Sequence, residues 1–86
     1  MKRLGAAREI RGKTLAECVT QSLEDYLHEL DGHQTSDLYQ LVLSEVERPM
    51  LRSVLNYVDG NQTRAAAMLG ISRGTLRKKL SQHGLD

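Results

Sequence analysis

The sequence predicts an all-α protein built from four helices. Apolar residues recur at steps of three and four over two long segments, which is the spacing of a helix face. Helix-capping residues precede the segments and glycines follow them. The chain has 86 residues, so one domain is expected, and a monomer of this size buries only about 60% of its unfolded surface.

The first helix is expected from Leu15 to Leu30. Thr14 and Glu17 have the spacing of a capping box, which satisfies two free N–H groups of the first turn. Gly32 is suited to the left-handed conformation that ends a helix. Cys18 is interpreted as a small buried apolar residue, and a lone cysteine without an intramolecular disulfide fits a reducing cytosol. The apolar stripe consists of Leu15, Val19, Leu23, Tyr26, Leu27 and Leu30.

The second helix is expected from Asp37 to Asp59, capped by Ser36 or Thr35. Its apolar residues cover more than one face, and a helix of this kind must be covered on most sides. The simplest cover in so short a chain is a second copy of the same helix, which predicts a C2 homodimer. The residues expected at the dimer interface are Leu38, Val42, Val46, Pro49, Met50 and Val54.

Pro49 lies inside the second helix. Its ring clashes with the carbonyl of Glu45 and it lacks a backbone donor, so the helix either stops or bends there. The apolar pattern continues in phase beyond Pro49, which favours one long kinked helix over two short ones.

The last third of the chain predicts two short helices joined by a tight turn. The third helix runs from Gln62 to Leu69 after an Asn61 cap, and the fourth runs from Arg73 to about Gln82 after a Ser72 cap. A helix-turn-helix needs a small residue where its helices cross, a glycine in the turn and an apolar residue on the second helix. Ala66, Gly70 and Leu76 meet these needs, although an αα-hairpin without a DNA role shares the pattern.

Charge is distributed unevenly along the chain. Residues 1–13 carry a net charge of +4, residues 14–60 carry −7 and residues 61–86 carry +4. We therefore expect a flexible basic arm over 1–13, dimerisation helices over 14–60 and a DNA-binding helix-turn-helix over 61–86. No segment resembles a membrane span or a secretory signal.

The basic residues of the fourth helix are placed to meet DNA. Leu76 and Leu80 define its buried side, so Arg77 and Lys78 point outward. Arg73 stands at the N-terminal end, where such helices reach base edges and where arginine pairs with guanine. Thr75, Arg77 and Lys78 are expected to reach bases or phosphates. Asn61, Thr63 and Arg64 open the third helix, where N–H groups favour a phosphate.

Two stretches resemble a known family. "GNQTRAAAMLGISRGTLRKKL" and "SDLYQLVLSEVERPML" are similar to the Fis family of bacterial nucleoid-associated proteins, and the resemblance runs from about Leu15 to Leu85. It implies an intertwined homodimer that bends DNA with weak sequence specificity. Roles in nucleoid organisation, transcription regulation and site-specific recombination, and a place in the cytoplasm at the nucleoid, are also implied. The implied DNA contacts are Asn61, Thr63, Arg64, Ser72, Arg73, Thr75, Arg77 and Lys78.

Three departures from the family pattern change these expectations. Ser72 stands where an enteric member has Asn, so a base contact there is in doubt while the capping role remains. "SQHG" over 81–84 replaces a more basic stretch, which predicts a shallower salt dependence. Residues 1–13 do not resemble the arm that touches the recombinase, so recombinase contact is unsupported, as is contact with RNA polymerase.

Three other functions are alternatives to a free-standing DNA-binding protein. The first is the Fis-like terminal domain of an enhancer-binding activator; the initial Met, the lack of a P-loop and the Fis-like middle argue against it. The second is a helical module that binds an acidic protein. An enzyme is disfavoured because His28, His33 and His83 are scattered and pair with no nucleophile or zinc-ligand motif. We therefore expect no catalytic residues, cofactor or metal, and we expect His83 to be exposed without a role.

Overall fold

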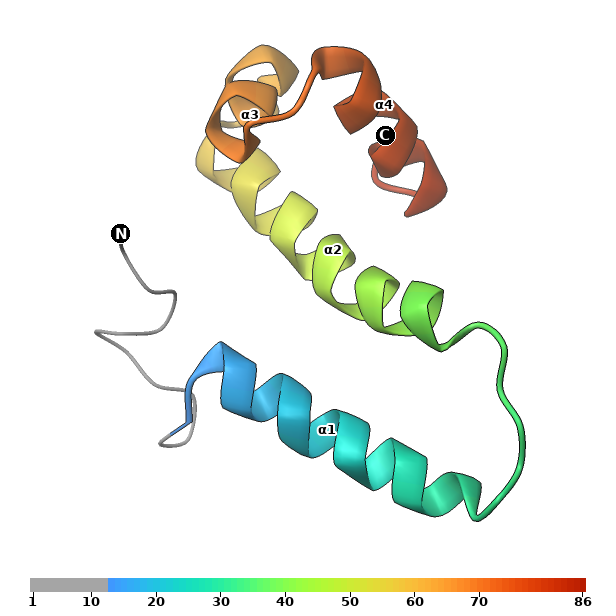
Figure 1. The fold of residues 1–86 in the computed structure, drawn as a ribbon. Helices are drawn as coiled ribbons and strands as arrows, with labels where there is room; N and C mark the ends of the chain where they lie inside the picture. The colour runs from blue at the N-terminus through green and yellow to red at the C-terminus, as the bar shows by residue number, and fades with distance from the viewer. Residues whose placement is uncertain (1–12) are drawn as a thin grey trace. The chain divides into compact units, whose positions relative to one another are not determined.

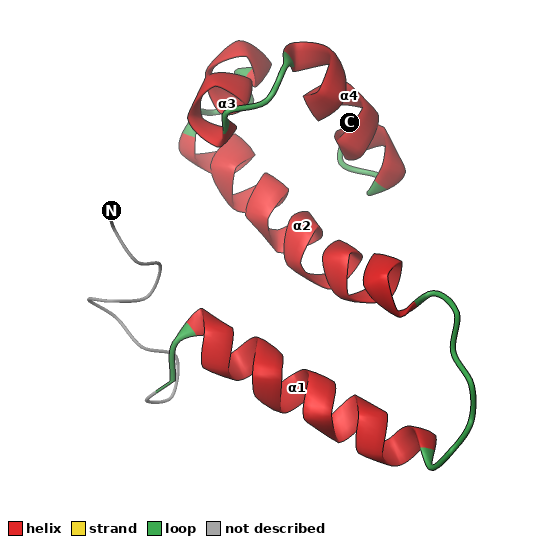
Figure 2. Cartoon of the chain, in the orientation of Figure 1, coloured by secondary structure: helices red, strands yellow, loops and turns green. Residues whose placement is uncertain are grey.

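The computed structural model of the protein describes residues 13–86, and its regular elements are helices (Figures 1 and 2). They are α1 (Leu15–Leu30), α2 (Leu38–Tyr57), α3 (Gln62–Leu69) and α4 (Arg73–Gln82). This confirms the all-α prediction. The described residues form two units, α1 with its flanks up to Thr35 and a second unit from Ser36 to Asp86. The predicted basic arm lies outside the described residues except for Lys13.

Helix α1 begins and ends where the sequence predicts. The Thr14 hydroxyl accepts a hydrogen bond from the Glu17 N–H at 3.1 Å, and the Glu17 carboxylate accepts one from the Thr14 N–H at 3.5 Å. This is the predicted capping box. At the other end both Asp31 and Gly32 have positive φ, 46° and 85°, so the chain leaves the helix in a left-handed turn. No residue of α1 is buried, and Cys18 is only half-buried rather than buried.

Helix α2 starts one residue later and ends two residues earlier than predicted. Asp37 occupies the N-cap position and makes no side-chain cap hydrogen bond. The predicted capping by Ser36 or Thr35 is therefore wrong, because neither residue occupies that position at the first turn. The helix ends where Asp59 and Gly60 take φ values of 54° and 80°. Gly60 then donates its N–H to the carbonyl of Leu55 at 2.8 Å.

Pro49 lies within α2, and the helix continues through it. The possibility that the chain stops being helical at this residue is thereby excluded. The kink itself stays a prediction. The in-phase apolar residues on both sides of Pro49 belong to one element, as the sequence pattern indicates.

Local hydrogen bonds define α3, α4 and the turn between them. The Asn61 side chain accepts from the N–H of Arg64 at 3.1 Å, and the Ser72 hydroxyl accepts from the N–H of Thr75 at 3.0 Å. Gly70 has a φ of 75°, and its N–H reaches the carbonyl of Ala66 at 2.9 Å. Both helices have the predicted bounds because each cap satisfies a donor that the helix leaves free.

The buried core of the second unit joins the C-terminal half of α2 to α3 and α4. Ala66 and Leu76 are 5% and 0% exposed, which confirms the close helix crossing predicted from their spacing. Because α2 supplies part of this core, it helps to fix the position of α4 (Figure 1). The buried residues of this core are Leu51, Val58, Ala65, Ala66, Leu76 and Leu80. Over residues 13–86, none of the helices has both the length and the apolar character that a membrane span requires.

Candidate nucleic-acid interface

The first turn of α4 is held by two side chains that bond to each other. The Ser72 hydroxyl accepts from the Thr75 N–H and donates to the Thr75 hydroxyl at 2.9 Å. Both residues are exposed, as is Arg73 between them. The helix therefore begins at a fixed point, with a guanidinium on its first residue. Ser72 uses its single proton within the protein, which fits a capping role better than a base contact.

The outer side of α4 presents a group of cations. Leu76 and Leu80 are fully buried on the inner side. Arg73, Arg77 and Lys78 are exposed and line one hollow, together with Gln62 of α3. A guanidinium can bind a phosphate or the O6/N7 edge of guanine through two hydrogen bonds, and an ammonium can bind a phosphate. The structure thus brings together the three cations of α4 that the sequence places at the site.

The same hollow includes residues that sequence reasoning missed. Gly74, Ser81 and Asp86 line it. Asp86 is the only acid among residues 61–86, so it lowers the positive potential of a surface that is otherwise basic. Its position next to the cations follows from the turn after α4, where Leu85 packs against the core. No sequence pattern signals this proximity.

The start of α3 carries the other predicted contacts. Asn61, Thr63 and Arg64 are all exposed. The Asn61 side chain is bonded to the N–H of Arg64 and so serves as the cap. These three residues do not line the hollow of α4, whereas their neighbour Gln62 does. They form a separate polar edge at the positive end of the α3 dipole, where an anion is stabilised.

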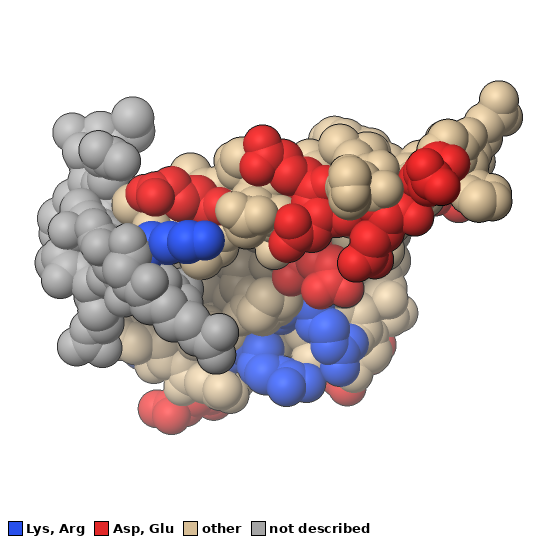
Figure 3. Space-filling model, turned by 90° about the horizontal axis from the view of Figure 1, so that it is seen from below, with Lys and Arg blue, Asp and Glu red and all other residues tan. Residues whose placement is uncertain are grey.

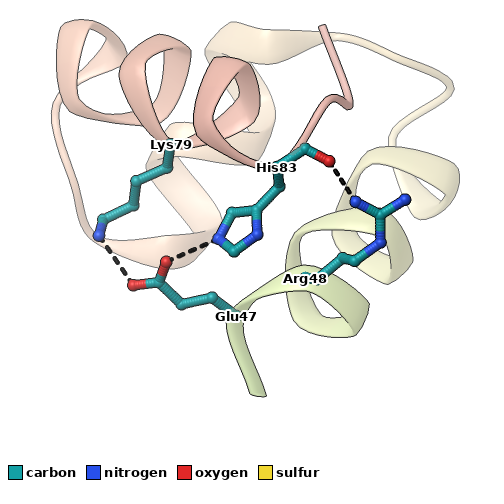
Figure 4. A network of polar contacts seen from close by, with 4 residues as sticks. All are labelled: Glu47, Arg48, Lys79 and His83. Atoms are coloured by element: carbon teal, nitrogen blue, oxygen red, sulfur yellow. Dashed lines mark hydrogen bonds and ion pairs between the residues drawn. The ribbon is translucent and has the colours of Figure 1, made fainter. Parts of the chain in front are cut away.

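An acid on α2 binds two residues at the end of α4 (Figure 4). The Lys79 Nζ lies 2.8 Å from Glu47 Oε2, and the His83 Nε2 lies 3.0 Å from Glu47 Oε1. Arg48, next to Glu47, donates a hydrogen bond to the carbonyl of His83. The hydrogen bond from Lys79, followed by the one with His83, holds the pKa of the Glu47 carboxyl below its ordinary value.

The position of His83 corrects a prediction. The sequence suggests an exposed histidine without a role, but its side chain is only 9% exposed and contacts Glu47. The prediction is wrong because the turn after α4 brings the ring back toward α2, a contact across 36 positions that local patterns do not reveal. His28 and His33 are exposed as predicted. Within residues 13–86, no cluster of His, Cys, Asp and Glu is arranged to hold a metal ion.

Helix α1 and the α3–α4 region carry charges of opposite sign. Helix α1 contains Glu17, Glu24, Asp25 and Glu29 and has no lysine or arginine. Figure 3 shows both acidic side chains, in red, and basic side chains, in blue, on the face seen there. The five cations of residues 61–86 lie in α3 and α4. The sign of the charge therefore favours binding of an anionic ligand at α3 and α4 over binding at α1.

The geometry of α3 and α4 defines a helix-turn-helix protein, with a left-handed glycine in the turn and exposed cations on the second helix. The particular family follows from sequence comparison. The family described as "Bacterial regulatory protein, Fis family" matches residues 42–83. Together with relatives more than 50% identical over most of their length, this match shows that the chain belongs to the Fis family, which confirms the resemblance found in its sequence.

Similar relatives support this assignment over nearly the whole chain. A protein of Actinobacillus succinogenes named "DNA-binding protein Fis" is 55% identical over 83 residues, covering 96% of this chain and 84% of the relative. The protein of the same name from Haemophilus influenzae is 55% identical, covering 95% and 83%. The one from Vibrio atlanticus is 53% identical, covering 91% and 80%.

Proposed function

We propose that this chain is a DNA-binding protein that acts as a homodimer, bends double-stranded DNA with weak sequence specificity, and thereby organises the nucleoid and regulates transcription. The observation that carries the proposal is the grouping of Arg73, Arg77 and Lys78 on the outer side of α4. It is supported by relatives that are named DNA-binding protein Fis. The proposed action is binding without catalysis, in the cytoplasm at the nucleoid.

The proposed DNA contacts are of two kinds. Asn61, Thr63 and Arg64 at the start of α3 bind phosphates and set the orientation of the protein, because such contacts carry no sequence information. Arg73 enters the major groove first and reads a guanine. Arg77 and Lys78 continue along the groove to further phosphates or bases. Thr75 is exposed and supports Ser72 in fixing the start of α4.

The dimer is supported by apolar surface that one chain leaves uncovered. No residue of α1 is buried, although it carries an apolar stripe. In α2 the only buried residue is Leu51, and Leu41 and Met50 are each 43% exposed. In the proposed dimer a second copy of the chain contacts α2 at Leu38, Val42, Val46, Pro49, Met50 and Val54, of which Val54 also packs against the core of its own unit. Native mass measurement should find two chains; a monomer at micromolar concentration would exclude this arrangement.

DNA bending follows from the pairing of two recognition helices. Two copies of α4 must enter adjacent major grooves, which lie about 34 Å apart on straight DNA. In the Fis-like arrangement the helices are closer than this, so the duplex bends and its central minor groove narrows. The free-energy cost of bending depends on how readily the central base pairs, which the protein does not contact, can deform. This dependence gives sequence selectivity without base contacts.

A pair of charge-matched variants tests the proposed surface. Arg77→Ala removes a cation from the hollow of α4, and Arg52→Ala removes an exposed cation from α2, away from that hollow. We expect Arg77→Ala to weaken duplex binding by about tenfold, the effect of roughly one charged hydrogen bond. Arg52→Ala should change it little. Equal effects would mean that only net charge matters and that α4 is not the DNA-binding surface.

A further inference from the structure

We propose that Glu47 of α2 is a positioning residue for the DNA-reading helix α4. This inference rests on the proposed function and adds a residue that makes no DNA contact. Glu47 binds both Lys79, in the last turn of α4, and His83, the residue that follows the helix. Figure 4 shows the two side chains converging on one carboxylate.

The contacts are placed where α4 needs a second fixing point. The helix has ten residues, so it is about 15 Å long. Leu76 and Leu80 anchor it in the core, but they lie on one stripe. Two anchors on one stripe resist separation from the core better than rotation about the helix axis. Glu47 adds a polar contact at the far end of the helix, and through Lys79 this contact reaches the flank of that stripe, which resists rotation.

A neighbouring contact strengthens the same attachment. Arg48 donates a hydrogen bond to the backbone carbonyl of His83. Glu47 and Arg48 are adjacent on α2, so one turn of α2 binds both the side chain and the backbone of the residue that ends α4. This carbonyl belongs to the helix end, where the helix itself provides no partner.

The geometry favours a positioning role over a purely stabilising one. Lys79 and Glu47 have side chains that are 32% and 16% exposed, and partly exposed ion pairs contribute little to the free energy of unfolding. Fixing the orientation of α4 is a different effect from adding to the free energy of unfolding. Base readout depends on hydrogen-bond geometry, and functional groups must be held within about 0.5 Å of their productive positions. Rotation of α4 would displace Arg73 and Arg77 together.

The chain offers a matched control for the test. Glu45 lies on α2 two residues before Glu47, is exposed, and has no side-chain hydrogen bond or ion pair in the described part of the chain. Glu47→Ala and Glu45→Ala remove the same charge from the same helix. The change in net charge is the same in both variants, although only Glu47→Ala also frees Lys79. A ratio of affinities for two duplexes cancels electrostatic effects that do not depend on sequence, so a difference in that ratio reports the contact with α4.

The experiment measures discrimination between two duplexes. One duplex of ~27 bp, long enough for two half-sites and flanks, is selected from a random pool with the wild-type protein. The other is a scrambled duplex of equal composition. We expect Glu47→Ala to reduce the ratio of the two dissociation constants by about tenfold, the size of one lost base contact. Glu45→Ala should keep the wild-type ratio. Unfolding curves and native mass are recorded for each variant at the same temperature.

The outcomes separate the inference from the function on which it rests. If the wild-type protein binds neither duplex, the proposed function fails. If it discriminates and Glu47→Ala discriminates equally well, the positioning role is wrong. If Glu47→Ala does not fold, Glu47→Met takes its place, because methionine matches glutamate in length and helix propensity. Discrimination by Glu47→Met equal to that of the wild type would then show that the positioning role is wrong. Glu47→Gln keeps one acceptor oxygen and should recover part of the lost discrimination.

Discussion

Lys79 of α4 is paired with Glu47 of α2, with 2.8 Å between Nζ and Oε2. Its neighbour Lys78 is exposed and lines the hollow with Arg73 and Arg77. Two adjacent lysines in the sequence thus have different surroundings. One is bound to an acid within the protein, and the other is available to a phosphate.

This difference predicts two different salt dependences. Lys78→Ala should reduce the slope of log affinity against log salt concentration by about 1 per subunit, because each phosphate contact releases condensed counterions. Lys79→Ala should leave the slope nearly unchanged, since its charge is already paired. Titrations of one duplex at several salt concentrations give both slopes. Equal slopes for the two variants would show that Lys79 leaves Glu47 when DNA binds.

Arg73→Ala should relax sequence preference at one base position per half-site. Arg73 is exposed on the first residue of α4, and a bidentate arginine–guanine contact contributes about 1–3 kcal/mol of discrimination. Competition among duplexes substituted at single positions locates the affected base pair. A uniform loss across all sequences would instead make Arg73 a phosphate contact.

Leu80→Ala should destabilise the second unit strongly. Leu80 is fully buried in the core shared by α2, α3 and α4, and truncation of a buried leucine costs about 2–5 kcal/mol. Met68→Ala is the matched control, because Met68 is 55% exposed and surface substitutions usually stay within about 0.5 kcal/mol. Urea unfolding compares the two. A small effect of Leu80→Ala would contradict the core described for α4.

The Glu47 contacts predict a pH dependence of stability. The pKa of Glu47 is lower in the folded protein than its ordinary value of 4.5. The charged carboxylate therefore adds to the free energy of unfolding at pH values above 4.5, and this contribution is lost as the pH falls through the folded pKa. Glu47→Gln should therefore be less stable than wild type at pH 7, by less than about 1 kcal/mol for a partly exposed pair. The two unfolding free energies should converge in acid. A constant difference from pH 7 to pH 3 would exclude the charge as its cause.

The bounds of α1, α3 and α4 were predictable because local residues encode them. Thr14, Asn61 and Ser72 each cap a helix, and Gly70 ends one. The start of α2 was less predictable, since Thr35, Ser36 and Asp37 are consecutive and all three are residue types that favour the cap position. Helix propensity does not distinguish among them.

The candidate site was predictable only in part. The basic residues of α4 follow from charge and from the stripe set by Leu76 and Leu80. The contacts of Glu47 with Lys79 and His83 were not predictable, because they join residues 32 and 36 positions apart. A helix pattern specifies which face is buried, but it does not specify which side chains meet across two helices.

The most direct measurement is the affinity of the wild-type protein for a ~27-bp duplex with an A/T-rich centre, repeated across salt concentrations. The proposed function predicts tight binding with two chains per duplex and an affinity that falls steeply as salt rises. The salt slope counts the phosphate contacts. Absence of binding at low salt would contradict the assignment of the α3–α4 surface to DNA.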